Sequence, residues 1–455
     1  MSPDSDAPTG RSHRLDNITY GAYHQRNVPG VDDELARTGP DTPMGEYMRR
    51  SWQPVCLSED LKDLPRAITV MGEALVTFRD GAGRVGVLNR HCSHRGTSLE
   101  YGIIEENGIR CCYHGWQFDI DGRILDTPGE PPESRLKESF CHGAYPAFER
   151  DGLVFVYMGL PDDKPEFPVR DHYGSERLVP FSFSMKNNWL QSYENTLDPV
   201  HSTFLHTRMS GTQLAAAFGE LPCVEYQETA GGGGAFYISK RRLGDDRIWV
   251  RHVHTIFPNE GHFGTVFEEG DGEPYYFRRV YVSRWIVPQD DESCTIFGWR
   301  FFGDDLPGGD PARVGHNRAD FDGQAEQPDY ETKQRQPGDW EAQAGQRSIA
   351  VHALEHRGTT DGGVVMMRRG LRRAARGETP AAHSADGGVE FPNPHHVFAQ
   401  DTILPIAKGG AADDDRALLT EVGRRVTEVL LEADDLEGAA YSAAIVENLR
   451  ALADA

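Results

Sequence analysis

Two short motifs that pair a cysteine with a histidine constrain this chain more than any other feature of its sequence. Cys92-x-His94 and Cys111-x-x-His114 are separated by sixteen residues, and each offers one thiolate and one imidazole. Two such pairs on neighbouring loops can hold a [2Fe-2S] cluster, in which one iron takes two cysteines and the other takes two histidines. Two cysteines and two histidines can also close a tetrahedron around one zinc ion. The four residues therefore predict a metal site, and the pairs alone leave both metals open.

A second group of candidate ligands follows some eighty residues later, in the passage NNWLQSYENTLDPVHSTFLH. His201 and His206 offer two imidazoles, and a mononuclear non-haem Fe(II) takes two imidazoles and one carboxylate on one face, with neighbouring positions open. Histidines five residues apart point about 140° apart on a regular helix, so both reach one metal only where the helix is distorted. We therefore expect a distortion between them. Asp198, which precedes Pro199, is expected to cap a new helical turn.

Simpler interpretations exist for these histidines and for two other patterns. The histidine pair could pack beside an apolar helical stripe formed by Trp189, Tyr193, Leu197 and Leu205. His352-x-x-Glu355-His356 matches a zinc motif if the segment is helical, but a salt bridge from Glu355 to a nearby arginine is the simpler account. The glycine run 231–234 lacks a following Lys-Ser/Thr and is expected to form a hairpin loop.

The pattern of apolar residues predicts two structured domains in the 455 residues. Residues 1–42 are polar and expected to be loosely ordered, up to a helix-like stretch at TPMGEYM. Short alternating runs then predict a small antiparallel β domain over 43–160, with a hairpin turn at Asp121-Gly122. The Pro- and Asp-rich passage GLPDDKPEFPVRDH separates it from residues 161–455. There, a helix-like stretch from about Asn187 comes first and strand patterns follow. Helical spacing returns in RSIAVHALEH, VVMMRRGLRRAAR and the C-terminal segments. The predicted class is α+β.

Charge and cysteine usage exclude several classes of protein. The formal net charge of −24 argues against a nucleic-acid partner or an anionic membrane surface. Neither a signal peptide nor a run long enough to cross a bilayer is visible, so we expect a cytoplasmic protein. Seven unevenly spaced cysteines do not make a disulfide framework. Five of them are expected to be packed bystanders: Cys56, Cys112, Cys141, Cys223 and Cys294.

Both ligand groups resemble those of one enzyme family. Cys-x-His-Arg-Gly and Cys-x-x-His-Gly-Trp resemble the two-part Rieske motif, and Asn195-x-x-Asp198-x-x-His201-x-x-x-x-His206 resembles the iron-binding segment of Rieske non-haem iron oxygenase α subunits. Over roughly 42–373 the chain resembles the phthalate 4,5-dioxygenase-like branch. The resemblance implies a Rieske domain followed by a catalytic domain whose large antiparallel sheet is flanked by helices, in a helix-grip or START-like arrangement.

The resemblance also implies the cofactors and their ligands. The [2Fe-2S] cluster would be held by Cys92, His94, Cys111 and His114. The mononuclear Fe(II) would be held by His201, His206 and a distant aspartate, for which Asp339 in QPGDWEAQAGQRSI is the best match. Glu341 is the reserve, and a helix N-cap is the alternative role of Asp339.

Partners follow from the same resemblance. Family members form head-to-tail homotrimers, sometimes stacked, and receive electrons from a separate reductase or ferredoxin, so NAD(P)H acts only indirectly. Asn195 belongs to the catalytic pattern, and Asp198 would bridge His114 of one subunit to His201 of the next. Substituting Asn for Asp198 is expected to leave both centres filled but stop turnover.

Three functions remain in view at this point. The first is dihydroxylation of a small aromatic substrate with O2, and the second is monooxygenation or O- or N-demethylation by the same centres. The third is a Rieske electron-transfer protein without a catalytic iron. The sequence does not identify the substrate, because Arg251, Arg278 and Arg300 could be carboxylate anchors or surface charges.

Overall fold

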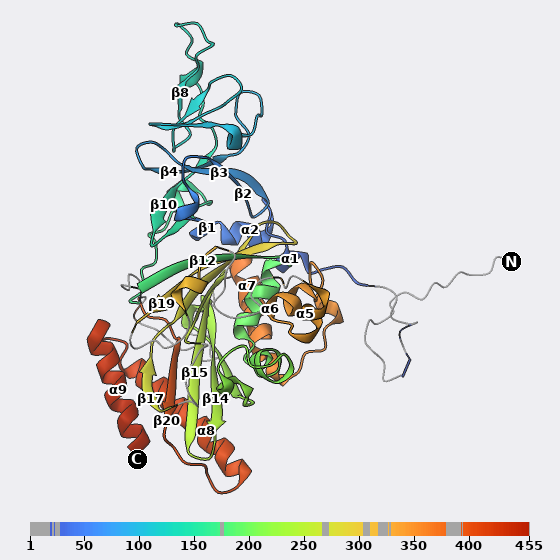
Figure 1. Cartoon of the computed structure of the whole chain (residues 1–455), viewed down its shortest axis with the longest axis vertical. Helices are drawn as coiled ribbons and strands as arrows, with labels where there is room; N and C mark the ends of the chain where they lie inside the picture. The colour runs from blue at the N-terminus through green and yellow to red at the C-terminus, as the bar shows by residue number, and fades with distance from the viewer. Residues whose placement is uncertain are drawn as a thin grey trace, which may run out of the picture.

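Three small antiparallel sheets form the N-terminal part of the molecule, which lies at the top of Figure 1. The structure is a computed structural model, and it describes residues 19–20, 22, 28–172, 177–265, 273–303, 310–316, 326, 329–378, 393 and 395–454. The first sheet contains β1 (Gln53–Leu57), β11 (Leu153–Val156) and β10 (Ala147–Arg150). The second contains β2 (Arg66–Val70), β3 (Glu73–Arg79), β4 (Val85–Asn89) and β9 (Ala144–Tyr145). The third contains β5 (Ile103–Glu105), β6 (Gly108–Arg110), β7 (Gln117–Phe118) and β8 (Ile124–Asp126).

Side-chain alternation along these short strands produces a separate apolar core under the third sheet. Leu99, Ile109 and Phe118 are fully buried there, and they surround the cysteines Cys92 and Cys111. Each strand contributes its inward-facing residues to this core because successive side chains point to opposite faces. The expected small antiparallel β domain is confirmed, and its core lies directly beneath the first candidate metal site.

The turn between β7 and β8 depends on the glycine that the sequence suggested. Gly122 has a φ of +82°, and a Cβ at this position would lie 2.1 Å from the carbonyl oxygen of His142. We expect Gly122→Ala to lower the free energy of unfolding by about 1–3 kcal/mol, because it adds both backbone strain and a clash. Denaturant titration would measure this change. Asp121→Asn at the exposed neighbouring position is the matched control, and an equal loss in both variants would contradict the explanation.

A nine-stranded antiparallel sheet forms the frame of the second part of the molecule in the described residues. Its main path runs β12 (Arg177–Met185), β19 (Cys294–Phe302), β18 (Val282–Pro288), β16 (Glu260–Phe263), β15 (Arg247–Ile256), β14 (Gly234–Leu243) and β13 (Cys223–Glu228). The strand β20 (Gln400–Leu404) pairs with β15 and with β17 (Tyr275–Arg278). The expected hairpin loop at the glycine run 231–234 joins β13 to β14 and is confirmed.

Helices cover both faces of this sheet, as Figure 1 shows. Phe236 and Ile238 of β14 pack on one face against α8 (Ala412–Glu432) and α9 (Gly438–Asp454). Their neighbours Ala235 and Tyr237 belong to the core on the other face, with α3 (Trp189–Glu194) and α7 (Gly362–Ala375). The α+β class with a helix-flanked antiparallel sheet is therefore confirmed. The second candidate metal site lies on the face covered by α3 and α7.

Two segments differ from the local expectation because tertiary contacts decide their structure. The end of the polar N-terminal segment forms α1 (Asp33–Ala36), where Leu35 is fully buried and accepts a hydrogen bond from Trp189 Nε1 at 3.2 Å. The helix expected for RSIAVHALEH is absent apart from one 3₁₀ turn (His352–Leu354). Its backbone bonds to α3 instead, because Ala350 N donates to Gln191 Oε1 at 2.9 Å. The other predicted C-terminal helices are confirmed as α7, α8 and α9.

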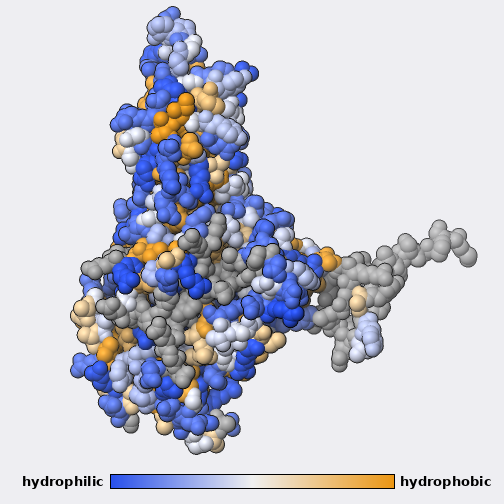
Figure 2. All heavy atoms as spheres, in the orientation of Figure 1, coloured by the Kyte–Doolittle hydropathy of each residue, from blue (hydrophilic) through white to orange (hydrophobic). Residues whose placement is uncertain are grey.

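The surface agrees with the acidic, polar composition. On the face shown in Figure 2 hydrophilic side chains dominate, and apolar ones gather in small groups. No helix in the described ranges is long and apolar enough to cross a membrane. The passage after β11 is packed rather than free, because Trp52 Nε1 donates to the carbonyl oxygen of Pro165 at 2.9 Å.

Candidate metal centres

The two Cys/His motifs form two similar loops above the third small sheet. In the first, Gly96 N donates to Cys92 O at 2.8 Å, and in the second, Gly115 N donates to Cys111 O at 3.1 Å. Gly96 and Gly115 have φ values of +77° and +76°, which a residue with a side chain rarely adopts. These two glycines therefore permit the tight turns that shape both loops.

These loops bring the four predicted cluster ligands together at one end of the molecule. The rings of His94 and His114 lie 4.5 Å apart between centroids, and both cysteines are buried beneath them. Burial raises the pKa of the Cys92 thiol to about 11, while the backbone N–H groups of His94 and Arg95 lower it. Those N–H groups therefore already point toward the sulfur, as they would in a loop that wraps a cluster.

The geometry of the four donors fits a two-iron cluster better than one zinc ion. His94 Nδ1 is buried and has no hydrogen-bond partner in the described part of the chain. Such an atom is costly to bury unless it binds something. Donor atoms around a single tetrahedral ion lie close together, yet the described residues contain only one set of three donors within 4.8 Å, and it is the other site. The four residues present thus fit a [2Fe-2S] group with two cysteine and two histidine ligands.

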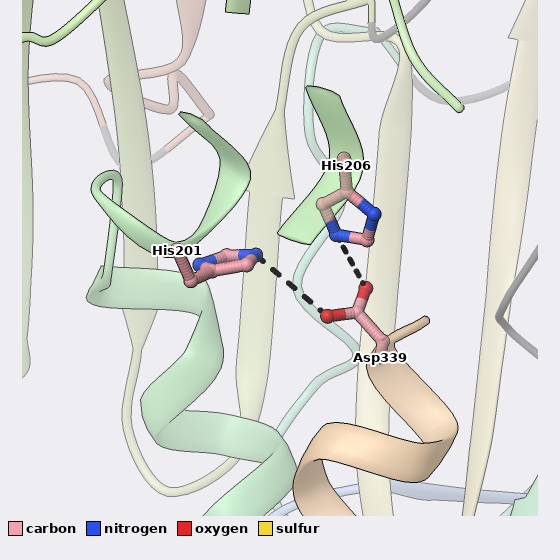
Figure 3. A group of neighbouring side chains, drawn as sticks. All are labelled: His201, His206 and Asp339. Atoms are coloured by element: carbon pink, nitrogen blue, oxygen red, sulfur yellow. Dashed lines mark ion pairs between the residues drawn. The ribbon is translucent and has the colours of Figure 1, made fainter. Parts of the chain in front are cut away.

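The second site brings two imidazoles and one carboxylate together from distant parts of the chain (Figure 3). His201 Nε2 lies 3.7 Å from Asp339 Oδ1, and His206 Nε2 lies 3.3 Å from Asp339 Oδ2. The three donor atoms lie within 4.8 Å of one another, which fits one metal ion with further positions open. His206 and Asp339 are buried, whereas His201 is partly exposed.

A distorted helix makes this convergence possible. The α-helical turn α4 (His201–Thr203) passes directly into a π-helix (Phe204–Met209). The wider π turn rotates His206 toward the face of His201, which a regular helix would not do. Before this turn, Asp198 Oδ1 accepts hydrogen bonds from Val200 N at 3.0 Å and from His201 N at 3.2 Å. The predicted distortion and the predicted capping by Asp198 are both confirmed.

Neighbouring side chains orient the three donors. His206 Nδ1 donates to Gln213 Oε1 at 2.8 Å, which leaves Nε2 for a metal. Asn195 Nδ2 donates to Asp339 Oδ1 at 3.1 Å. Burial lowers the pKa of His206, but the Asp339 carboxylate and the bond to Gln213 raise it more, so that its pKa lies above the usual value. The sequence analysis missed Gln213, because it lies seven residues beyond His206 outside any motif.

We expect Gln213→Leu to weaken binding of the mononuclear iron by about 10- to 100-fold, as is typical for the loss of an outer partner of a histidine ligand. Gln213 also donates to the carbonyl oxygen of Pro337 at 3.3 Å, just before Asp339, so the variant loosens two ligands. Iron titration of the iron-depleted protein would measure the change. Gln346→Leu, at an exposed glutamine, is the control, and unchanged affinity in Gln213→Leu would refute this role.

Two alternatives from the sequence lose support. Glu341, the reserve ligand, accepts a hydrogen bond from Gly338 N at 3.1 Å, and Asp339 begins α6 (Asp339–Ala344) rather than capping it. Glu355 forms the expected salt bridge to an arginine, Arg368, with Nη1 2.5 Å from Oε2. In the structured ranges His352, Glu355 and His356 do not form a metal set. Cys112 and Cys141 are exposed, so they are bystanders but not packed ones.

Two cavities meet at His201. The outer groove is partly open, has a volume of about 360 Å³, and is lined by Asp198, His356 and Asp361 among others. The inner cavity is smaller, about 70 Å³, and its lining includes His206, Asp339, Phe218 and Phe263. Both cavities also contact Asn195 and Asp198. The candidate iron site therefore lies between the outer groove and an inner cavity whose lining residues are mostly buried.

Comparisons with known proteins agree with this arrangement. The family described as Rieske [2Fe-2S] domain matches residues 51–146. A tert-butanol monooxygenase / tert-amyl alcohol desaturase oxygenase subunit of Aquincola tertiaricarbonis is 44% identical over 92% of this chain and 93% of its own length. The phenoxybenzoate dioxygenase subunit alpha of Ectopseudomonas oleovorans is 39% identical over 78% of this chain and 87% of its own.

The fold is shared with solved structures as well. Dicamba monooxygenase bound to 3,6-dichlorosalicylic acid superposes with a TM-score of 0.54 at 20% identity, over 72% of this chain and 98% of that one. The chain belongs to the Rieske non-haem iron oxygenases, which confirms the expected family. It is an oxygenase subunit that contains a [2Fe-2S] cluster and a mononuclear iron, and it needs a substrate, O2 and a separate electron-transfer partner. The comparisons do not favour an electron carrier without catalytic iron.

Proposed function

We propose that seven residues hold the two metal centres of this oxygenase. The cluster ligands are Cys92, His94, Cys111 and His114. The ligands of the mononuclear Fe(II) are His201, His206 and Asp339. The meeting of two imidazoles and one carboxylate within 4.8 Å, where the outer groove adjoins the inner cavity, carries this proposal.

When bound, the iron supplies the O2 chemistry and the cluster supplies electrons one at a time. The protein's own side chains orient the metal donors and exclude water from the substrate. His201 Nδ1 bonds to the backbone carbonyl oxygen of Asp198, and Asn195 holds the Asp339 carboxylate, so the donors keep their directions. Apolar side chains of the inner cavity surround the substrate and keep water out; they are Leu214, Phe218, Val253 and Phe263.

The reaction subtype has two candidates. The first is ring dihydroxylation of a small aromatic substrate, which the phenoxybenzoate dioxygenase relative supports. The second is monooxygenation, which the more similar tert-butanol monooxygenase relative supports, or O- or N-demethylation by the same centres. The names of these relatives contain an aromatic acid and an alcohol, so they do not settle whether the substrate carries a charge.

We further propose that the chain works as a homotrimer or as stacked trimers. In Figure 1 the sheet of β5–β8, with the cluster loops, lies at the top, whereas α6, which begins at Asp339, lies among the helices of the lower part. Electrons would therefore pass between neighbouring subunits. Asp198 Oδ2 has no hydrogen-bond donor among the described residues, lies 3.7 Å from His201 Nδ1, and belongs to the outer groove. We propose that this oxygen accepts a hydrogen bond from His114 of a neighbouring copy.

We also propose the domain boundaries, the electron donor and the location of the protein. The domain boundaries are 43–160 and 161–455 after a segment 1–42. Electrons come from a reductase or ferredoxin, so NAD(P)H acts only through that partner. A cytoplasmic location, without nucleic-acid or membrane partners, stays a prediction.

The test combines metal analysis with turnover. We expect about three irons per chain and O2 uptake that depends on substrate when a surrogate reductase is supplied. A panel of aromatic acids, their methyl ethers and small alcohols would be screened, and ¹⁸O₂ would show whether one or two oxygen atoms enter the product. A protein with both centres filled that shows no substrate-dependent uptake on the whole panel would contradict the proposed function.

A further inference from the structure

One arginine of the inner cavity has donors that the protein does not use. Arg284 lies in the middle of β18, is only 8% exposed, and lines the cavity together with His206 and Asp339. Its neighbours in register on both adjacent strands are glycines, Gly261 on β16 and Gly298 on β19. No larger side chain stands beside it on these strands, so its guanidinium is free to reach toward the segment that carries the iron ligands.

The contacts of Arg284 leave most of its hydrogen-bonding capacity unused. Nη2 donates to Thr196 Oγ1 at 2.8 Å, and the guanidinium lies 5.1 Å from the centroid of the Phe263 ring. Nε is buried and has no hydrogen-bond partner among the described residues. An arginine carries five donors in a planar fork, and neither a carboxylate ion pair nor any other hydrogen bond of Arg284 occurs in the part of the chain that the structure describes.

Two other buried arginines nearby have several acceptors within the chain, although Arg251 Nε also has no hydrogen-bond partner among the described residues. Arg251, which also lines the cavity, forms an ion pair with Asp401 at 3.2 Å and donates to the carbonyl oxygen of Thr265 at 2.6 Å. Arg241 donates to two backbone carbonyl oxygens, of Glu220 and Pro199, and to two serine hydroxyls. These two side chains therefore have structural roles. Arg284 differs from both, because its only acceptor is one hydroxyl.

A buried guanidinium without a counter-ion is costly to maintain. Burial lowers the pKa of Arg284, which reflects the loss of hydration around its charge, and the nearby Asp339 carboxylate opposes this. Asp339 is directed at the two histidines, with its oxygens 3.7 and 3.3 Å from their Nε2 atoms. It is therefore engaged with the iron site and does not form an ion pair with Arg284. The cavity thus holds one positive side chain for which the described chain supplies no anion.

We propose that Arg284 binds the carboxylate of the substrate, and that the substrate of this oxygenase is a small monocarboxylic acid. A guanidinium fork can donate two parallel hydrogen bonds to one carboxylate. Two arginines line the cavity, but Asp401 already neutralises Arg251. Arg284 alone is left, so the substrate is expected to carry one negative charge. Thr196 aims the fork, and the apolar side chains Phe218 and Phe263 contact the body of the substrate. This inference rests on the proposed function only in taking the inner cavity as the substrate site.

Binding of benzoate and of benzamide, which has the same shape without the charge, tests the proposal. Isothermal titration of the metal-loaded protein without O2 or reductase would give both affinities. We expect the wild-type protein to prefer benzoate by at least about tenfold. Arg284→Gln should lower benzoate affinity by about 10- to 100-fold and change benzamide binding by less than about threefold. Arg284→Lys should fall between the two, because it keeps the charge and loses the fork.

Two further variants separate this role from a general one. Thr196→Val removes the hydroxyl that aims the guanidinium and should weaken benzoate binding by about tenfold, even if Arg284→Gln fails to fold. Arg369→Gln removes an exposed arginine that pairs with Glu228 away from the cavity, and it should leave both affinities unchanged. Circular dichroism and iron content would show that each variant is folded and loaded.

The outcomes distinguish this inference from the proposed function. Equal affinity of the wild-type protein for benzoate and benzamide, no binding of benzoate at millimolar concentration, or an unchanged preference in a folded Arg284→Gln would each overturn the role of Arg284. Arg284-dependent benzoate binding without any substrate-dependent O2 uptake would support this role and contradict the oxygenase proposal instead. O2 uptake with neutral substrates and no preference for the anion would support the oxygenase proposal and contradict the role of Arg284.

Discussion

Asp339→Ala is expected to lose the mononuclear iron while the [2Fe-2S] cluster stays filled. The carboxylate is one of three donors at the site, and its oxygens lie 3.7 and 3.3 Å from the Nε2 atoms of His201 and His206. Losing an outer partner of a ligand usually weakens a metal site by about 10- to 100-fold, so losing a ligand should cost more than about 100-fold. Substrate-dependent O2 uptake should disappear as a result.

Two measurements check this result separately. Iron analysis should fall from about three irons per chain to about two. The visible absorption and electron paramagnetic resonance of the reduced cluster should not change, because the proposed cluster ligands lie in loops beside the β5–β8 sheet, whereas Asp339 lies in α6. A variant that keeps the full iron content and activity would show that Asp339 is not a ligand.

The matched control lies two residues away. Glu341→Gln changes a carboxylate to an amide on the same helix, but that carboxylate accepts a hydrogen bond from Gly338 N at 3.1 Å and is not part of the three-donor group. Because the amide oxygen of glutamine can still accept this hydrogen bond, the substitution should cost less than about 1 kcal/mol of stability and leave iron content and turnover close to normal. If Glu341→Gln lost the iron and Asp339→Ala kept it, Glu341 would be the ligand and Asp339 would not.

Local sequence patterns were sufficient to predict those parts of the two sites whose geometry depends on spacing along the chain. The two Cys/His motifs and their glycines form adjacent loops, and the structure brings the four predicted ligands together as their spacing suggested. The five-residue separation of His201 and His206 also predicted a helix distortion, and the structure has a π-helix at Phe204–Met209. In both cases the geometry follows from a few neighbouring residues.

Contacts between distant strands and loops could not be predicted in this way. Arg284 meets Thr196, 88 positions away in the chain, only because β18 pairs with β16 and β19 beside that segment. No local pattern marks this arginine among the others, and the sequence analysis considered Arg251, Arg278 and Arg300 instead. The segment RSIAVHALEH illustrates the opposite error, because helical spacing was overridden by bonds to α3 and its N-cap. One of these bonds runs from Asn188 N to Ser348 O at 2.7 Å. The choice between Asp339 and Glu341 also required the structure, since residues two apart on a helix point in different directions.

The second large effect is expected for Asp198→Asn, which should leave both metal centres filled and reduce turnover by more than about tenfold. The substitution keeps Oδ1, which accepts hydrogen bonds from the backbone of Val200 and His201, so the turn before α4 should survive. It replaces Oδ2, the oxygen without a donor among the described residues, by an amide group that cannot accept a hydrogen bond. A bridge from the neighbour's cluster histidine would then be lost.

The measurement has to separate electron transfer from assembly. Iron analysis and the spectrum of the reduced cluster should match those of the wild-type protein, and sedimentation should show the same oligomer. In single-turnover experiments with a pre-reduced cluster, reoxidation of the cluster by O2 and substrate should slow to the same degree as steady turnover. Asp361→Asn is the matched control, because Asp361 lines the same outer groove but its carboxylate accepts a hydrogen bond from Gly358 N at 2.6 Å. If Asp198→Asn reoxidised its cluster at the wild-type rate, Asp198 would be a capping residue and the path between subunits would have to run elsewhere.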